Sequence, residues 1–365
     1  MVTSFKHPFI RLKAATVLLA FYTVICCQTN PPDNPSSENV SFCFRLPGKE
    51  ETKAISDGLS ATELRLYAYD ANGTYLPALS IVREDAFAGR EATATLSLVK
   101  GMTYCFVFVA VNPAAADNAY VFDPAAKTLT VDYSVLTANN DAYDCFTASL
   151  LNFTVTGPFT QDVTLKRPFS QVNVGVPVAD YMVASNSGIK VDEIRSSLTF
   201  SDAGTEYDLM GNKVLSNAAD SVLVPAKLRP VSENLTVGTD TYKYMAMAYI
   251  LVPMDGVNDD NRALLGNVHL VLDVETAGGA TSTLHRNVAN VPVQKNWRTN
   301  LLGNIFGIQG GFHIYIDQRF TGDLPEDHPT GDHLSAGPNE AMEWDWGKGD
   351  APGGTENFTT EGGEW

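Results

Sequence analysis

Residues 296–306, with the sequence NWRTNLLGNIF, bring together side chains whose types could do chemistry. The segment holds Trp297, Arg298 and three asparagines, but it contains no histidine and no cysteine. Arg298 therefore has no activated nucleophile and no base beside it. Asparagine side chains bond readily to the backbone of turns, and Trp297 can seat against a sheet. We interpret the segment as a corner that braces the fold rather than as a catalytic centre.

The remaining histidines and acids form no catalytic pattern either. The sequence has no Gly-x-Ser-x-Gly elbow, no His-Glu-x-x-His, no P-loop and no dinucleotide fingerprint. His269, His285 and His313 alternate with apolar residues, which indicates surface or satisfied core positions in strands. The segment EDHPTGDH (326–333) has ligand types for a divalent cation but no rigid element to set their geometry. We predict that the protein is not an enzyme and has no cofactor and no metal site.

The composition sets the broad class. The chain has 365 residues, of which 44% are hydrophobic, so it can bury large cores and fits roughly two domains. Acids outnumber basic residues by 42 to 25, which gives a formal net charge of −17. The phosphates of nucleic acid would be repelled by such a surface, so we expect no nucleic-acid partner.

Residues 1–27 are predicted to be a lipoprotein signal peptide. Three basic residues precede the apolar run AATVLLAFYTVI (14–25), which is too short to span a bilayer and is typical of a secretory signal. The end of the run resembles a bacterial lipobox, in which an aliphatic residue lies three positions before a lipidated cysteine. This spacing favours Cys27, with Cys26 as the alternative. Residues 28–38, rich in Pro, Ser and Asn, are predicted to be a tether.

Alternation of apolar and polar residues dominates the body and predicts an all-β fold. In TELRLYAYD (62–70), two leucines and an alanine face one side while an arginine and two tyrosines face the other, as in a half-buried strand. Asn72-Gly73 then predicts a hairpin turn. The segment VPVADYMVA (176–184) is the best candidate for a short helix. Many strands with a turn signal about every ten residues indicate β-sandwich domains.

Composition shifts divide the chain further. We predict an N-terminal β-sandwich domain over 39–163, a C-terminal β-sandwich domain over 164–320 and an acidic tail over 321–365. The tail has eleven acids, one lysine and many Gly and Pro residues.

The tail contains one segment with an ordered pattern. Met342, Trp344 and Trp346 alternate with two acids, so an extended strand here would have one bulky apolar face. Burying each of these side chains stabilises by roughly 1.5–3 kcal/mol, so we expect a groove to accept them. That groove lies either in a neighbouring molecule or in this one, where the segment would act as an extra strand.

Three cysteines follow the leader: Cys43, Cys105 and Cys145. An odd number allows at most one intramolecular disulfide. Their apolar, strand-like surroundings favour buried free thiols, although a disulfide from Cys43 to either of the others would pin the first strand.

Six segments form a specific series along the chain. In chain order they are FCFRLPG (42–48), LRLYAYDANGTYLP (64–77), VTLKRPFSQVNVG (163–175), YMAMAYILVP (244–253), NVPVQKNWRTNLLGNIFG (290–307) and GFHIYIDQRF (311–320). This series resembles fimbrillin-like lipoproteins of Bacteroidales, the subunits of type V pili, and the resemblance extends over about residues 38–320. The resemblance implies two transthyretin-like β-sandwich domains in tandem and export as a surface-exposed lipoprotein of the outer membrane. It also implies a fimbrial subunit that polymerises with copies of itself or with other subunits.

The resemblance further implies assembly by strand exchange. A protease cuts after a basic residue, the first strand leaves, and a C-terminal segment of another subunit takes its place. The first strand would be 39–47, with Arg45 as the processing residue and Lys49 or Lys53 as alternatives. The donor would be the alternating segment of the tail. We expect the first strand to lie at an open sheet edge; a strand locked in the middle of a sheet would count against this interpretation.

The length of the tail leaves the role in the filament open among stalk, anchor and tip. The alternative function is a surface lipoprotein that does not polymerise and binds a glycan or a host protein.

Overall fold

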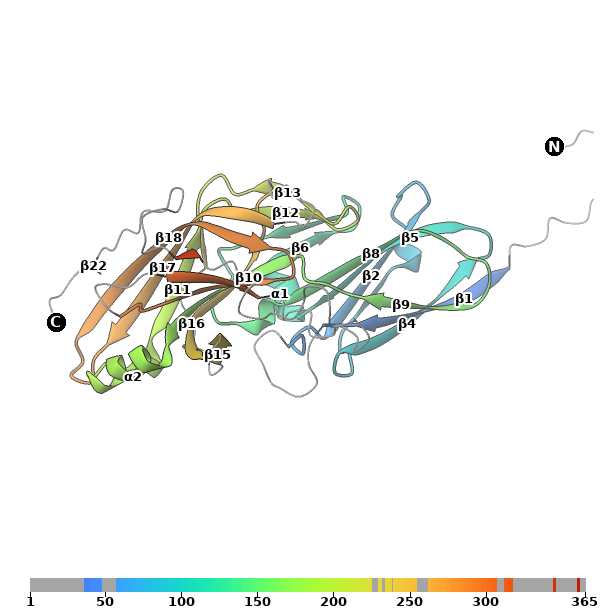
Figure 1. The fold of residues 1–365 in the computed structure, drawn as a ribbon. Coiled ribbons are helices and arrows are strands. Elements are labelled where there is room, and N and C mark those ends of the chain that lie inside the picture. The colour runs from blue at the N-terminus through green and yellow to red at the C-terminus, as the bar shows by residue number, and fades with distance from the viewer. Residues whose placement is uncertain are drawn as a thin grey trace, which may run out of the picture. The chain divides into compact units, whose positions relative to one another are not determined.

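A computed structural model describes residues 36–47, 57–224, 229–231, 234–237, 239–254, 262–306, 312–317, 344–345 and 360–361 (Figure 1). Contacts group the chain into two units, 1–36 and 37–365. The expected signal peptide and both of its cysteines fall outside the described residues. Among the helices that are described, none has the length and apolar character needed to cross a bilayer.

The protein has an all-β sandwich architecture, as the alternation predicted. The first sandwich pairs a three-stranded sheet with a four-stranded sheet. The three-stranded sheet runs in the order β4 (Glu91–Val99), β1 (Ser37–Arg45) and β9 (Phe159–Thr164). The four-stranded sheet runs in the order β3 (Ile81–Arg83), β2 (Glu63–Asp70), β5 (Thr103–Val111) and β8 (Cys145–Thr154).

The first core lies between these two sheets. Along β4 every second residue is buried, because Ala92, Ala94, Leu96 and Leu98 face the core while the residues between them face solvent. β1 follows the same rule. This period of two places one full face of each strand in the core.

The expectation that 62–70 forms a half-buried strand is wrong. β2 buries both faces, since Leu64 and Leu66 join the first core while Tyr67 and Tyr69 join the second. Tyr69 is 0% exposed, and its hydroxyl donates to the carbonyl of Pro124 at 2.9 Å. In an alternating pattern a tyrosine is assigned to the polar face, but its ring can be buried when its hydroxyl has a hydrogen-bond partner.

The second core lies between two further sheets. The ten-stranded sheet has the path β21 (Trp344–Asp345), β20 (Phe312–Asp317), β19 (Arg298–Gly303), β10 (Phe169–Pro177), β16 (Asp240–Leu251), β12 (Gly204–Asp208), β7 (Thr128–Val131) and β6 (Tyr120–Asp123). β13 (Lys213–Asn217) pairs with β12, and β15 (Asn234–Val237) pairs with β16. The five-stranded sheet comprises β14 (Val222–Val224), β11 (Arg195–Phe200), β17 (Arg262–Glu275), β18 (Thr281–Gln294) and β22 (Thr360–Glu361).

Among the described residues, two α-helices accompany the strands. The short helix expected near 176–184 is present as α2 (Val178–Asn186). α1 (Pro113–Asn118) was not expected, although Asn112 caps it by accepting from the N–H of Ala114 at 3.0 Å. Pro at the first helical position after an Asn cap is a recognisable helix start that the strand-dominated pattern obscured.

The chain between the sandwiches crosses from one to the other. After β5, the chain forms α1, β6 and β7, and β7 pairs with β12 of the second sandwich before the chain returns as β8. The boundary between 163 and 164 therefore stays a prediction, because contacts do not divide the body at any point after Ser36.

Residues 296–306 form a corner followed by a strand. Asn296 has a positive φ of 63°, and its N–H donates to the carbonyl of Phe169 at 2.8 Å. Its side-chain oxygen accepts from the N–H of Arg167 at 3.1 Å. β19 begins two residues later and runs parallel to β10, deep in the ten-stranded sheet. The polar cluster thus satisfies a buried bend, as the sequence indicated.

Candidate functional site

The first strand lies between two neighbours. All nine residues of β1 pair antiparallel with β4, and six of them also pair parallel with β9. The expectation of a first strand at an open edge is therefore wrong. Local alternation could not place β1, because the partner strand β9 starts more than a hundred residues later in the chain.

The inward face of β1 is large and apolar. Val40, Phe42 and Phe44 are 0–1% exposed. The ring centroid of Phe42 lies 5.0 Å from that of Phe106 and 5.3 Å from that of Phe108, both on β5. Aromatic pairs at such distances in tilted arrangements stabilise beyond their buried area. β1 therefore supplies much of the packing surface of the three-stranded sheet.

The flanking strands leave room for these rings. Phe42 pairs with Ala94 and Phe44 with Ala92, so each phenylalanine of β1 faces a small side chain on β4. β9 adds little to the core, with Val163 as its one buried side chain. The phenylalanine rings of β1 thus occupy core space that the side chains of β4 and β9 beside them do not occupy.

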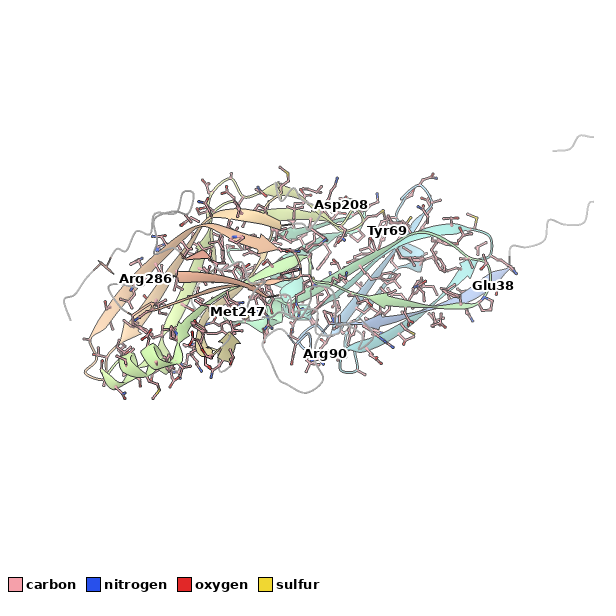
Figure 2. The ribbon with its side chains drawn as sticks, in the orientation of Figure 1. Glu38, Tyr69, Arg90, Asp208, Met247 and Arg286 are labelled. Carbon is pink, nitrogen blue, oxygen red and sulfur yellow. The ribbon has the colours of Figure 1, made fainter. Side chains whose placement is uncertain are left out.

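The outward face of β1 carries only weak contacts. The hydroxyls of Ser41 and Thr95 are 2.8 Å apart. Arg45 Nε lies 3.5 Å from Glu91. Near the start of the strand, on the side of Val40 rather than the outward side, Lys100 Nζ lies 3.6 Å from Glu38, which is labelled in Figure 2. Exposed ion pairs of this kind contribute at most about 1 kcal/mol. The stability of β1 in the sheet therefore comes from its backbone ladders and inward side chains.

The expected processing residue lies inside the ladder. Arg45 has an exposed side chain, but its carbonyl accepts from the N–H of Leu165 at 3.0 Å. The next N–H, that of Leu46, donates to the carbonyl of Arg90 at 2.9 Å. A protease must break both bonds before it can hold the peptide bond after Arg45. The alternatives Lys49 and Lys53 lie outside the described residues, so the choice among the three stays a prediction.

All three cysteines after the leader are free thiols. Cys105 and Cys145 are buried and Cys43 is half-buried. Burial raises the pKa of the Cys145 thiol well above its ordinary value, and the nearby Asp144 carboxylate adds to the rise. No disulfide joins β1 to another of the described strands, so its attachment to the sandwich is noncovalent apart from the chain itself.

Part of the predicted donor segment pairs within this chain. Trp344 pairs antiparallel with Ile314, and Asp345 with His313, so the short strand β21 lies at the end of the ten-stranded sheet. Met342 and Trp346 lie outside the described residues. Donation of this segment to another molecule stays a prediction.

Two sets of buried polar interactions, an ion pair and a hydrogen-bonded cluster, were not anticipated from sequence. Arg167 donates from Nε and Nη2 to the two oxygens of Asp144 at 2.6 and 2.7 Å, and both side chains are at most 1% exposed. Burial raises the pKa of Asp144 although Arg167 opposes the rise. In the ten-stranded sheet, the amide oxygen of Asn300 accepts from Asn173 at 2.9 Å and from Tyr244 at 3.0 Å. Such pairings join residues far apart in the chain, so no local signal reveals them.

No catalytic constellation is evident in the part of the chain that the structure describes. Within it, no group of three or more His, Cys, Asp or Glu side chains is present that could hold a metal ion. His269 and His285 do lie together, with ring nitrogens 3.2 Å apart. His313 pairs through its backbone in β20.

Comparisons with known proteins give one family. No curated protein matches the sequence. Solved structures similar to this chain include the tip fimbrial protein Mfa3 of Porphyromonas gingivalis with a C-terminal truncation, 13% identical with a TM-score of 0.40, covering 76% of this chain and 99% of that one. They also include the fimbrial anchor protein Mfa2 of the same organism, 14% identical with a TM-score of 0.38, covering 77% and 96%. At such scores the similarity identifies neither the fold nor the function.

The sequence also matches a family model over most of its length. Residues 32–345 match the model of the family of unknown function DUF6562. This range starts in the predicted tether, includes both sandwiches and ends at Asp345, so it covers well over half of the chain. The protein therefore belongs to the family of unknown function DUF6562.

Proposed function

We propose that this protein is a subunit of cell-surface fimbriae in which a strand from another subunit replaces β1. The middle position of β1 counts against the exchange at an open edge that the sequence led us to expect. The observation that carries the proposal is instead that β1 comes first in the fold along the chain and supplies the largest inward side chains of its sheet, so that one cut after it would free a strand and leave an apolar slot. The resemblance of the sequence motifs to fimbrillin-like lipoproteins points to the same assembly mode.

Cutting the chain after β1 would leave it held by noncovalent contacts alone. Its departure would expose unpaired N–H and C=O groups on both β4 and β9, together with an apolar slot over β5. An extended segment from another molecule satisfies such a gap by pairing on both sides, while alternate side chains enter the slot.

A strand in the middle of a sheet must be replaced, whereas an edge strand could simply be added to. Loss of Val40, Phe42 and Phe44 from the core costs roughly 5–9 kcal/mol at about 1.5–3 kcal/mol for each. An intact chain therefore keeps its first strand. Exchange requires both a cut and a competing strand, so the position of β1 makes assembly depend on proteolysis.

The tail segment is the proposed donor. Met342, Trp344 and Trp346 repeat the alternation of Val40, Phe42 and Phe44, with large apolar side chains at every second residue. In the monomer, two residues of this segment pair with β20. We assign this pairing to the state before donation, in which the segment rests on its own molecule.

The same proposal includes the leader. Lipidation at Cys27 would anchor the exported subunit in the outer membrane, with its body at the cell surface. Subunits joined by strand exchange would then support adhesion to a host protein or a glycan. Several acyl chains hold a membrane much more firmly than one.

The experiment that tests the proposal is limited cleavage of the folded chain. A trypsin-like protease should release β1 as a peptide identified by mass spectrometry, and ladders that resist mild SDS should follow. Arg45→Gln is compared with the paired change Lys49→Gln and Lys53→Gln, and the set that abolishes release identifies the processing site. A cut chain that loses β1 and remains monomeric would contradict the proposal. Uncut monomer that binds glycans on an array would support the non-polymerising alternative.

A further inference from the structure

His269 and His285 form a pair on the longest ladder among the strands that the structure describes. They lie on β17 and β18, whose fourteen-residue strands pair along almost their whole length. In the register, His269 faces Asn287 and His285 faces Val271, so the two histidines are diagonal neighbours. Their strand neighbours Val268 and Leu284 are buried in the second core. The two imidazoles are therefore on the outer face of the five-stranded sheet.

The two rings present nitrogens to each other. His269 Nε2 lies 3.2 Å from His285 Nδ1, while the ring centroids are 5.3 Å apart and the planes differ by 18°. The nitrogens are closer than the centroids, so the nearly parallel rings are offset. Without a metal, the two nitrogens form a hydrogen bond whose donor depends on the tautomer. Two nitrogens bound tetrahedrally to zinc at about 2.0–2.1 Å lie roughly 3.3–3.4 Å apart, so the same spacing is also close to that required for chelation.

The surroundings of the two rings admit solvent. Both side chains are half-buried, so water can reach the pair and complete a coordination shell. Nearby, Asn267 donates to the side-chain oxygen of Asn287 at 3.2 Å, which holds the polar face in place.

We propose that His269 and His285 form a surface site for a late first-row divalent metal ion, where the sequence led us to expect no metal site. Imidazole ligands favour Cu²⁺, Ni²⁺ and Zn²⁺ and are poor ligands for Mg²⁺ and Ca²⁺, which prefer oxygen. The rigid two-strand ladder fixes both ligands before the ion arrives, and ordered ligands lose little freedom on binding. With two protein ligands and solvent at the remaining positions, the ion stays exchangeable and open to a further ligand.

The test is titration of the full chain with Ni²⁺ by isothermal calorimetry. His328→Ala and His333→Ala are introduced first, because these tail histidines are alternative ligands. In this background we expect one Ni²⁺ for each chain. Loss of one ligand should weaken binding at least about tenfold, since even partners that only orient a ligand cost 10–100-fold. His269→Ala and His285→Ala should both show this loss, and His313→Ala, a histidine on a different sheet, should not.

A second readout separates binding from misfolding. Zn²⁺ should raise the melting temperature of the background chain because it binds the folded state, and His269→Asn should abolish that rise while leaving the metal-free melting temperature close to its starting value. Mg²⁺ should raise the melting temperature of neither the background chain nor the His269→Asn variant. The proposal is overturned if the background chain binds no Ni²⁺, if both His269→Ala and His285→Ala bind it unchanged, or if binding disappears with the tail histidines.

Discussion

Phe42→Ala tests the claim that β1 is held by its inward side chains. Phe42 is fully buried, and its ring lies within 6.3 Å of the rings of Phe44, Phe106, Phe108 and Phe153. Truncating a buried phenylalanine to alanine costs about 3–5 kcal/mol, with the larger values where the site cannot collapse. The residue opposite is Ala94, which is too small to fill the hole. We therefore expect a loss of about 4–5 kcal/mol in the free energy of unfolding.

Urea unfolding followed by circular dichroism measures this loss, and Ser41→Ala is the matched control. Ser41 is on the same strand but faces outward, where its one side-chain hydrogen bond to Thr95 contributes about 0.5–1.5 kcal/mol. If the first sandwich unfolds separately, the loss should appear in the transition of that sandwich alone.

The same variant has a kinetic consequence for exchange. In cleaved protein, displacement of β1 by a labelled peptide of residues 340–347 should accelerate in Phe42→Ala. If the inward contacts are lost before the rate-limiting step, about 4 kcal/mol corresponds to roughly a thousandfold. A loss below about 1 kcal/mol would refute the packing argument. A full loss of stability with an unchanged displacement rate would refute the link between packing and exchange.

Four further predictions follow from the same structure. Arg167→Met should cost about 3–5 kcal/mol in chemical denaturation because it leaves Asp144 buried without its bidentate partner, whereas the double change with Asp144→Leu should recover much of that loss. Burial, with a smaller effect from Lys166, lowers the pKa of Lys295 to about 8 from an ordinary 10.5. Between these values the unfolded chain binds more protons, so the free energy of unfolding should rise with pH from about 8 to about 10.5, and Lys295→Met should flatten that rise relative to the parent. Trp344→Ala with Trp346→Ala should leave a folded monomer by circular dichroism and abolish SDS-resistant ladders; unchanged ladders would remove the tail from the mechanism. Cys27→Ala should release the protein from the membrane fraction of expressing cells, and release by Cys26→Ala instead would move the lipidation site by one residue.

Local pattern was sufficient to identify most strands but not their neighbours. The alternation in β4, the turn at Asn72-Gly73 and the helix α2 all follow from side chains adjacent in sequence. The placement of β1 between β4 and β9 does not follow from neighbouring side chains. Every strand has the same backbone N–H and C=O groups, and these do not specify which strand will pair with it. The edge position expected for β1 was wrong for that reason.

Burial on both faces was hidden for a similar reason. Tyr67 and Tyr69 look like the outer face of a strand, yet the segment around Pro124 covers Tyr69 and binds its hydroxyl. Likewise, the contact between His269 and His285 depends on the register of β17 against β18, because a shift of one residue would move one ring to the other face.

The sequence by itself determined that this protein is a chain of alternating strands with a basic and apolar segment over residues 1–27 and an acidic segment over residues 321–365. Those features depend on residues close together in the chain, and their periodicity and charge can be determined from the sequence without a structure. Only the tertiary structure decided that β1 is enclosed on both sides, that Arg167 meets Asp144 and that two histidines meet on an outer face. Each of these contacts joins segments distant in sequence, and the free energy that selects them comes from packing the whole core.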